Sequence, residues 1–228
     1  YANDVIFRVQ SGCDQAKVPH PRILTECGRA MVAYHSVLVM DVLGVSNFDR
    51  YEVPPQIPED SPQQIQDLFT IHQELKKKNL LESYHDTFQA IDETLSMFSY
   101  GALNIEQRAL VERLFWAICN KMLKMVRKLD YVPEELQGLE SLLSDTYFCN
   151  FSIFKSMPDS WAIDQLFPIM PIHRLKEKPV RRGVLGDITC DSDGKIDKFI
   201  DLRDVRKTLQ LHPFKSEPYY LGVFLLGA

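Results

Sequence analysis

The stretch Gly183-Val-Leu-Gly-Asp-Ile-Thr-Cys-Asp-Ser-Asp-Gly194 determines how the rest of the chain is interpreted. Residues 184–189 are mostly apolar and β-branched, which predicts a short strand. Residues 190–194 are small polar side chains and a glycine, which favour a turn. We therefore expect a strand whose end presents one thiol, Cys190, and two carboxylates, Asp191 and Asp193.

A second motif, Glu26-Cys-Gly-Arg29, follows the apolar segment 22–25. That segment is interpreted as a strand, and the apolar residues 30–44 predict a helix followed by another strand. Helix and strand in this order are typical of one step of a β/α barrel. Taken alone, a four-residue motif is a weak signal, and a turn with an incidental ion pair is the simpler interpretation.

The middle of the chain differs in composition from both ends. Residues 53–62 hold four prolines and predict an extended linker. Apolar residues then recur at helical spacing, first after a cap expected at Ser61 and later from about residues 84, 104 and 133. We therefore predict three domains. Residues 1–50 are the C-terminal end of a (β/α)8 barrel, 51–146 an inserted helical bundle, and 147–228 the start of a β-sandwich or β-barrel domain.

Composition excludes several classes of function. The net charge of −5 over 228 residues argues against a nucleic-acid surface, and no apolar run is as long as a membrane-spanning helix. The five cysteines are an odd number at irregular spacing, unlike a disulfide framework or a zinc finger, which favours a reducing, cytoplasmic compartment. His72 and His85 have no thiol or carboxylate at ligand spacing, so we predict no metal site.

Together and in this order, the two motifs resemble those of the barrel-type, pyridoxal-phosphate-dependent amino acid decarboxylases. The Cys190 turn, the helical insertion and residues 156–171 are most similar to the biosynthetic arginine decarboxylase branch. The resemblance implies that Glu26 holds the pyridine nitrogen of pyridoxal 5′-phosphate and keeps the ring cationic. It also implies that Gly28 and Arg29 bind the phosphate. Cys27 departs from the family pattern, which commonly has proline there.

The same resemblance gives the Cys190 turn a chemical role. It implies that Cys190 donates a proton to the substrate Cα, and a thiol with an ordinary pKa of roughly 8.5 can do so near neutrality. In this family the cysteine comes from the partner subunit, so Cys190 is expected to face Glu26 of another chain, in a homodimer or a dimer of dimers. Carboxylates would hold the basic end of the substrate through paired hydrogen bonds. The candidates in order are Asp191, then Asp193 and Asp164, then Asp159. Turn formation is an equally good interpretation of Asp193, and Asp164 could be a local cap.

The resemblance implies the conversion of L-arginine to agmatine and CO2 in putrescine and spermidine biosynthesis. It covers nearly the whole chain, but the lysine that links the cofactor is expected upstream of Tyr1. The chain is therefore interpreted as an internal segment of a longer enzyme and is expected to be inactive alone. Mg²⁺ accompanies some family members, although the sequence has no recognisable ligand cluster for it.

Three alternatives stay open at this point. A related enzyme could act on ornithine, lysine or diaminopimelate, and substrate assays would separate these. A non-catalytic paralogue could keep the fold and bind a partner, although Glu26, Arg29 and Cys190 together argue against it. A helical interaction module with β flanks would explain residues 55–145 but would leave both motifs as coincidence.

Overall fold

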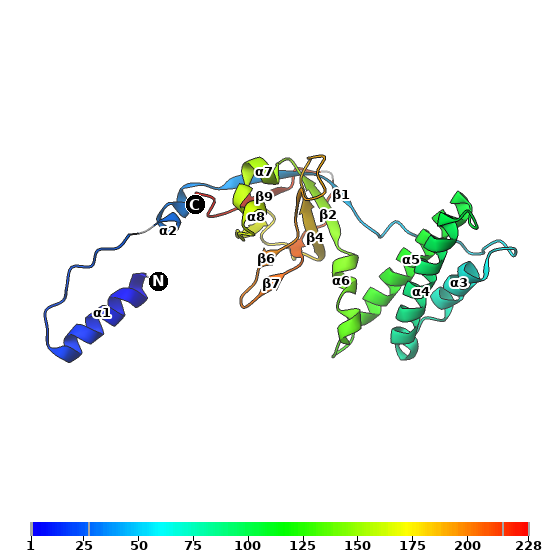
Figure 1. Ribbon diagram of the computed structural model, residues 1–228, viewed down its shortest axis with the longest axis horizontal. Coiled ribbons are helices and arrows are strands. Elements are labelled where there is room, and N and C mark those ends of the chain that lie inside the picture. Colours follow the sequence, from blue (N-terminus) through cyan, green and yellow to red (C-terminus); the bar gives the residue numbers. More distant parts are fainter. Residues whose placement is uncertain (1, 27, 216, 228) are drawn as a thin grey trace.

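The computed structural model describes residues 2–26, 28–215 and 217–227. The chain is elongated, with helix α1 at one end, a helical bundle at the other and a β-sheet between them (Figure 1). Helix α1 spans Ala2–Ala16 and buries none of its residues. The position of Cys27, where the sequence departs from the decarboxylase pattern, lies outside the described residues.

The strand predicted at residues 22–25 is not present. Residues 18–26 form no regular structure and are exposed. A strand needs a neighbour to pair its backbone N–H and C=O groups, and no strand described in this structure pairs with this segment. The helix predicted after residue 29 is confirmed as two short turns, α2 (Arg29–Val32) and the 3-10 helix η1 (Ala33–His35).

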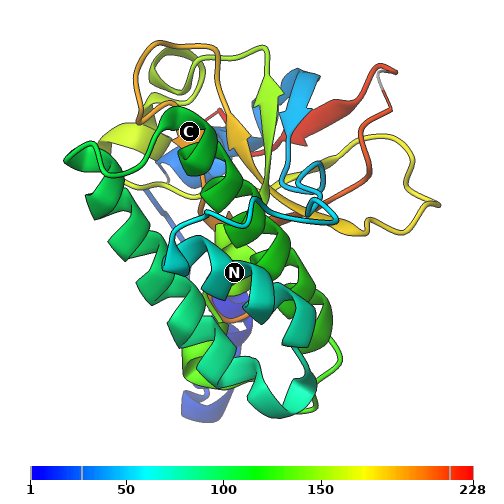
Figure 2. The same ribbon diagram turned by 90° about the vertical axis from the view of Figure 1, so that its right-hand side faces the viewer.

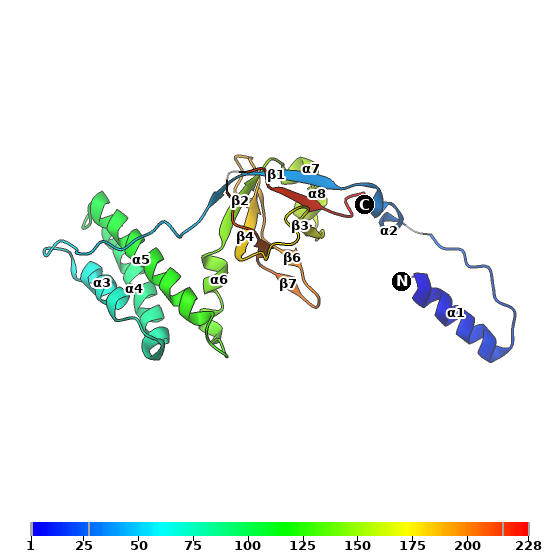
Figure 3. The same ribbon diagram turned by 180° about the vertical axis from the view of Figure 1, so that it is seen from behind.

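The assignment of the next strand to a β/α barrel is wrong. Strand β1 (Leu38–Ser46) pairs antiparallel with both β2 (Asp145–Cys149) and β9 (Tyr220–Val223), whereas barrel strands run parallel. β1 therefore belongs to the sheet that the C-terminal third of the chain forms, and not to the barrel domain predicted for residues 1–50. In Figure 3, β1 (blue) lies beside β9 (red), although Ser46 and Tyr220 are 174 positions apart in the sequence.

The predicted helical bundle is confirmed. Its long helices α3 (Gln63–Glu74), α4 (Leu80–Ser99) and α5 (Ile105–Val126) pack on one another, and Figure 2 views them from the bundle end, in front of the sheet. Short helices complete it: η2 (Lys77–Asn79), η3 (Glu134–Leu136) and α6 (Leu139–Leu142). Asn104 caps α5 by accepting a hydrogen bond from the backbone N–H of Gln107, as its position before the helix favours. The predicted apolar face of α5 is buried, including Val111, Leu114 and Ile118.

One local expectation in the bundle is wrong. Ser61 does not cap α3, because its hydroxyl donates to the carbonyl of Pro58. On α4 the most buried positions are mainly small residues, including Ser83, Thr87, Ala90 and Thr94, and larger side chains such as Tyr84, Phe88 and Ile91 pack against the core beside them. The buried threonine hydroxyls donate to carbonyls one turn earlier, which satisfies them without a partner on another helix.

Strands β1, β2 and β9 belong to a seven-stranded sheet. Its strand order is β3-β9-β1-β2-β4-β5, and β8 also pairs with β4. Only β2 and β4 run parallel among these described pairs. Their bounds are β3 Ile169–Pro171, β4 Arg181–Gly186, β5 Lys195–Ile196 and β8 Leu209–Leu211, with a separate hairpin of β6 Phe199–Ile200 and β7 Val205–Arg206. Helices α7 (Ile153–Ser156) and α8 (Pro158–Ala162) follow β2. The β-rich C-terminal region is thus confirmed, with its own core around Tyr147, Leu185 and Leu221.

Candidate functional site

The Cys190 turn begins where strand β4 ends, at Gly186, three residues earlier than the sequence pattern predicts. The backbone N–H of Asp187 donates to the carbonyl of Gly194 at 2.7 Å and closes residues 187–194 into a loop. Inside the loop, Asp191 accepts hydrogen bonds from the backbone N–H groups of Asp193, at its side chain, and of Gly194, at its carbonyl. Cys190 and Asp191 are exposed. The loop therefore presents the thiol and the first-ranked substrate carboxylate to the outside.

Asp187 anchors this loop to the body of the domain, a role that the sequence analysis missed. Its side chain is buried, with the residue only 6% exposed. One carboxylate oxygen accepts from the backbone N–H and the hydroxyl of Thr189, at 2.9 and 2.6 Å, and the other accepts from the N–H of Ile153 at 2.9 Å. The signal in the sequence is a lone carboxylate inside an apolar run, because such a group must find donors when the run is buried.

These contacts also determine the charge state of Asp187. Burial alone favours the neutral acid, but the hydrogen bonds from Thr189 and Ile153 outweigh it and hold the pKa of this carboxyl below its ordinary value. A side chain at Gly194 would collide with the Asp187 carboxylate and with Thr189, so only glycine fits the closing position of the loop. Asp193-Gly194 thus has the turn role that the sequence allowed for it.

The structure brings together two of the predicted substrate-binding carboxylates. Asp164 and Asp193 line one cavity of about 170 Å³, together with Trp161 and Lys198. Lys198 Nζ lies 2.8 Å from Asp164 Oδ1, so a cation already occupies one face of this carboxylate. The Trp161 ring packs edge-on against Phe154, with 5.2 Å between ring centroids, which fixes the indole at the cavity wall. Asp197 and Lys195 also line the cavity, so three carboxylates face two lysines beside the aromatic wall, and this net negative charge suits an organic cation.

The predicted cofactor-binding segment lies before helix α2. Glu26 and Gly28 are exposed, and a Cβ placed on Gly28 would meet nothing within 4 Å. Arg29 donates from one nitrogen, Nη1, to the carboxylate of Asp159 and, at 3.1 Å, to the side-chain oxygen of Gln165. The Arg29 side chain stays 57% exposed, and its other N–H groups remain available.

Helices α7 and α8 link the two predicted motifs within one chain. Asp187 of the Cys190 loop binds the first residue of α7, Ile153, and α7 packs on α8. Helix α8 carries Asp159, which binds Arg29. Among the described residues, neither Glu26 nor Arg29 shares a side-chain hydrogen bond with Cys190. The two motifs are therefore attached to one scaffold, without a side-chain hydrogen bond that joins them directly among the residues described.

The residues at 26–29 fit the phosphate and pyridine of pyridoxal phosphate in their chemistry. The open backbone at Gly28 and the free guanidinium edge of Arg29 suit a phosphate, and the exposed Glu26 suits a protonated ring nitrogen. For Mg²⁺ the fit is absent within the described region of the chain, where no group of three or more histidine, cysteine, aspartate or glutamate side chains could hold a metal ion. No helix among the residues described is long and apolar enough to cross a bilayer.

Residues 58–140, which make up most of the helical bundle, match the family described as the arginine decarboxylase helical bundle domain. The middle of this chain is therefore similar to the helical domain of arginine decarboxylases. Over its whole length the chain is 50% identical to a biosynthetic arginine decarboxylase of Nostoc sp. and 52% identical to one of Gloeobacter violaceus, and it covers 34% and 35% of them.

A solved structure agrees with these relatives. The biosynthetic arginine decarboxylase SpeA from Campylobacter jejuni matches the whole chain with a TM-score of 0.73 and 34% sequence identity, and the chain covers 36% of that structure. The chain spans about a third of the length of the relatives it matches. Along its whole length the chain is therefore similar to the biosynthetic arginine decarboxylases.

Proposed function

We propose that the full-length protein carrying this chain is a pyridoxal-phosphate-dependent arginine decarboxylase. It would convert L-arginine to agmatine and CO2, as a step toward putrescine and spermidine. The observation that carries the proposal is the identity of about half of all positions to biosynthetic arginine decarboxylases along the entire chain. The Cys190 loop and the segment 26–29 supply residue types that this reaction requires. The free thiols of Cys13, Cys119, Cys149 and Cys190 support a reducing compartment, which we take to be the cytoplasm.

In the proposed site, the segment 26–29 binds the cofactor. Arg29 and the backbone at Gly28 hold the phosphate, and Glu26 keeps the pyridine nitrogen protonated. When bound, pyridoxal phosphate supplies an electron sink for the pair of electrons released as CO2 leaves. Asp159 and Gln165 orient Arg29 from one side and leave the rest of its guanidinium free.

The Cys190 loop provides the proton donor and binds the side chain of the substrate. The Cys190 thiol donates a proton to Cα after CO2 departs, and solvent restores it. Asp191 binds the guanidinium end of the substrate, with Asp193 and Asp164 in support. At Asp164 the substrate cation would compete with Lys198 Nζ, because both would bind Oδ1 of this carboxylate.

The assembly that this requires is a homodimer, or a dimer of dimers, in which Cys190 of one subunit faces Glu26 of the other. Three features support it. Cys190 is exposed within a closed loop, Glu26 is exposed, and the two side chains share no hydrogen bond in the part of the chain that is described. The domain boundaries also belong to this proposal, with residues before α2 as the end of a β/α barrel.

The test compares the full-length protein with its Cys190→Ala variant, and uses Cys13→Ala as the matched control. Release of CO2 and formation of agmatine are measured, with ornithine, lysine and diaminopimelate as competing substrates. We expect decarboxylation of arginine, a fall of about a hundredfold or more in kcat for Cys190→Ala, and no change for Cys13→Ala. If the full-length protein binds pyridoxal phosphate but decarboxylates another of these amino acids faster, that amino acid replaces arginine as the proposed substrate. One that does not bind the cofactor would refute the proposal and favour a non-catalytic paralogue.

A further inference from the structure

A cavity lies where the helical bundle meets the sheet, apart from the Cys190 loop and the segment 26–29. It measures about 610 Å³. Its walls come from the linker after β1, helix α5 and the starts of strands β2 and β4. We refer to it as the junction cavity. Its volume lies within the ordinary range for small-molecule sites, roughly 300–1,000 Å³.

The charges on its walls are mostly positive, although the chain as a whole carries −5. Five cations line the junction cavity: Lys121, Lys124, Arg127, Arg181 and Arg182. Three carboxylates line it as well: Asp49, Glu52 and Asp145. The cavity therefore has a net charge of two positive. An acidic protein with a basic cavity concentrates anions at that cavity.

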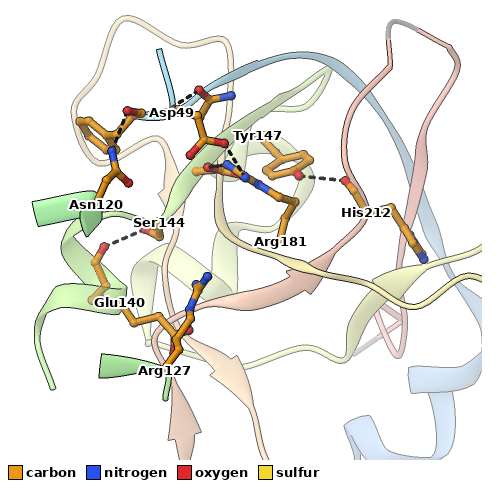
Figure 4. Close-up of polar contacts among 12 residues, drawn as sticks. Asp49, Asn120, Arg127, Glu140, Ser144, Tyr147, Arg181 and His212 are labelled. Atoms are coloured by element: carbon orange, nitrogen blue, oxygen red, sulfur yellow. Dashed lines mark hydrogen bonds and ion pairs between the residues drawn. The ribbon is translucent and has the colours of Figure 1, made fainter. Parts of the chain in front are cut away.

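Two of the five cations are already satisfied by the protein. Arg181 makes a paired contact with the buried Asp145, with both N–O distances at 2.6 Å, and also binds Asp49. Lys121 donates to the backbone carbonyl of His72. In Figure 4, Arg181 reaches toward Asp49, while Arg127 and Glu140 lie below them. These contacts build the wall and leave little capacity for a ligand.

The other three cations, Lys124, Arg127 and Arg182, are less fully paired with protein groups than Arg181 is. Arg127 Nη2 and Arg182 Nε approach the same oxygen of Glu140, Oε1, at 3.2 and 3.9 Å, so one carboxylate serves two guanidinium groups. Lys124 lies in the last turn of α5, and Arg127 caps the C-terminal end of the helix three positions later, which places both on one side of that end. Glu140 itself does not line the junction cavity, whereas both arginines do, so an anion in the cavity would compete with the Glu140 carboxylate for the two guanidinium groups.

The electrostatics of a neighbouring residue agree with this geometry. His72 also lines the junction cavity. Burial and the positive charge of Lys121 lower the pKa of its imidazole, so this histidine stays neutral in the physiological range and adds no charge. Cationic ligands, including the substrate and product of the proposed reaction, are disfavoured by the net positive charge.

We propose that the junction cavity binds a small anion of the phosphate class, held by Lys124, Arg127 and Arg182. Guanidinium forks pair with phosphate oxygens through two parallel hydrogen bonds, and a lysine adds a point charge. The anion would bridge the bundle, through α5, to the sheet, through β4. It would thus act at a site separate from the segment 26–29, whether it is free phosphate or a phosphomonoester of a small metabolite.

Calorimetric titration of the full-length protein tests the proposal, with pyridoxal phosphate present in saturating amount. Inorganic phosphate and glycerol phosphate are titrated separately at constant ionic strength, and chloride serves as the reference anion. We expect saturable binding of one or both phosphates and none of chloride. Inorganic phosphate alone would identify the free ion as the ligand, and tighter binding of the ester would identify a phosphorylated metabolite.

Four variants make the test specific to this cavity. Arg182→Gln and Lys124→Gln should each weaken phosphate binding about tenfold, because each removes one charge-assisted contact. Glu140→Gln should tighten it several-fold, because it removes the competing carboxylate. Lys78→Gln, at an exposed lysine of the same bundle, should change nothing. Circular dichroism confirms that each variant is folded.

The results that would overturn the proposal are equally specific. Binding that is absent in the wild-type protein refutes it directly. Binding that persists in Arg182→Gln and Lys124→Gln but is lost in Arg29→Gln would place the anion at the segment 26–29 instead. Equal weakening by Lys78→Gln would mean general screening of surface charge rather than a site.

Discussion

Replacing Asp187 should loosen the Cys190 loop from the rest of the domain. In the native structure this carboxylate accepts three hydrogen bonds and is almost fully buried. Asp187→Ala leaves the N–H groups of Ile153 and Thr189 without partners, and each buried orphan costs about 1–3 kcal/mol. The Thr189 hydroxyl can turn toward water because that residue is only half-buried. We expect a loss of about 3 kcal/mol in the free energy of unfolding.

Asp187→Asn should cost less, about 1–2 kcal/mol, because the amide oxygen can still accept from Thr189 while the amide NH2 faces the N–H of Ile153. The assay is urea denaturation of the full-length protein at pH 7, followed by circular dichroism. Asp130→Asn, at an exposed aspartate, is the matched control and should leave stability unchanged. Decarboxylation should fall in Asp187→Ala even under conditions in which the variant is folded, since the loop no longer holds Cys190 in place.

The same residue gives a pH test. The folded-state pKa of Asp187 lies below the ordinary aspartate value of 3.8, so the unfolded chain binds the proton more readily. The stabilisation is therefore complete well above pH 4 and is lost as the pH falls below that value. The stability gap between wild type and Asp187→Asn should narrow toward pH 3. A gap of equal size at pH 7 and pH 3, or an Asp187→Ala variant as stable as wild type, would refute this account of the loop.

Three further predictions concern other regions of the structure. Arg181→Gln should destabilise the protein by about 3 kcal/mol in thermal or urea unfolding, because it leaves the carboxylate of Asp145, only 2% exposed, without its paired partner. Gly194→Ala should cost about 2 kcal/mol by overpacking against the loop anchor, and it should also lower activity. Cys119 and Cys149 should resist alkylation at pH 7 in the folded protein, as read by peptide mass spectrometry. Burial raises the pKa of each thiol to about 12, and at Cys149 the nearby charge of Asp41 adds to it.

Each of these has a matched comparison. Arg206→Gln removes an exposed ion pair and should have little effect beside Arg181→Gln. Gly12→Ala, in a helix with open space around the glycine, should be tolerated where Gly194→Ala is not. Exposed Cys190 should label readily where the buried thiols do not. Rapid labelling of Cys149 in the native state would contradict its place in the sheet core.

The sequence predicts the bundle well because its helices are amphipathic over long segments, and burial of one face follows directly from that pattern. It fails for β1, since a mostly apolar segment of nine residues is equally compatible with a parallel barrel strand and an antiparallel sheet strand. Only the pairing with β9 decides between them, and that partner lies far along the chain. Local patterns carry no information about such distant pairing.

The candidate site shows the same division between local and distant information. The turn character of residues 190–194 is local and is evident from the sequence. The contacts of Arg29 with Asp159 and Gln165 join residues more than 100 positions apart, so no spacing rule could reveal them. Arg29 is held by the same helix, α8, that packs on α7, and α7 receives the Asp187 anchor of the Cys190 loop. If two subunits share each site, a shift of α7–α8 within one chain would then move the cofactor half of one site and the proton-donor half of the other.

Asp187→Ala should therefore disturb phosphate contact at Arg29 as well as proton transfer at Cys190. Weaker cofactor affinity in that variant, measured by absorbance titration, is the result that distinguishes this linkage from a purely local loop defect.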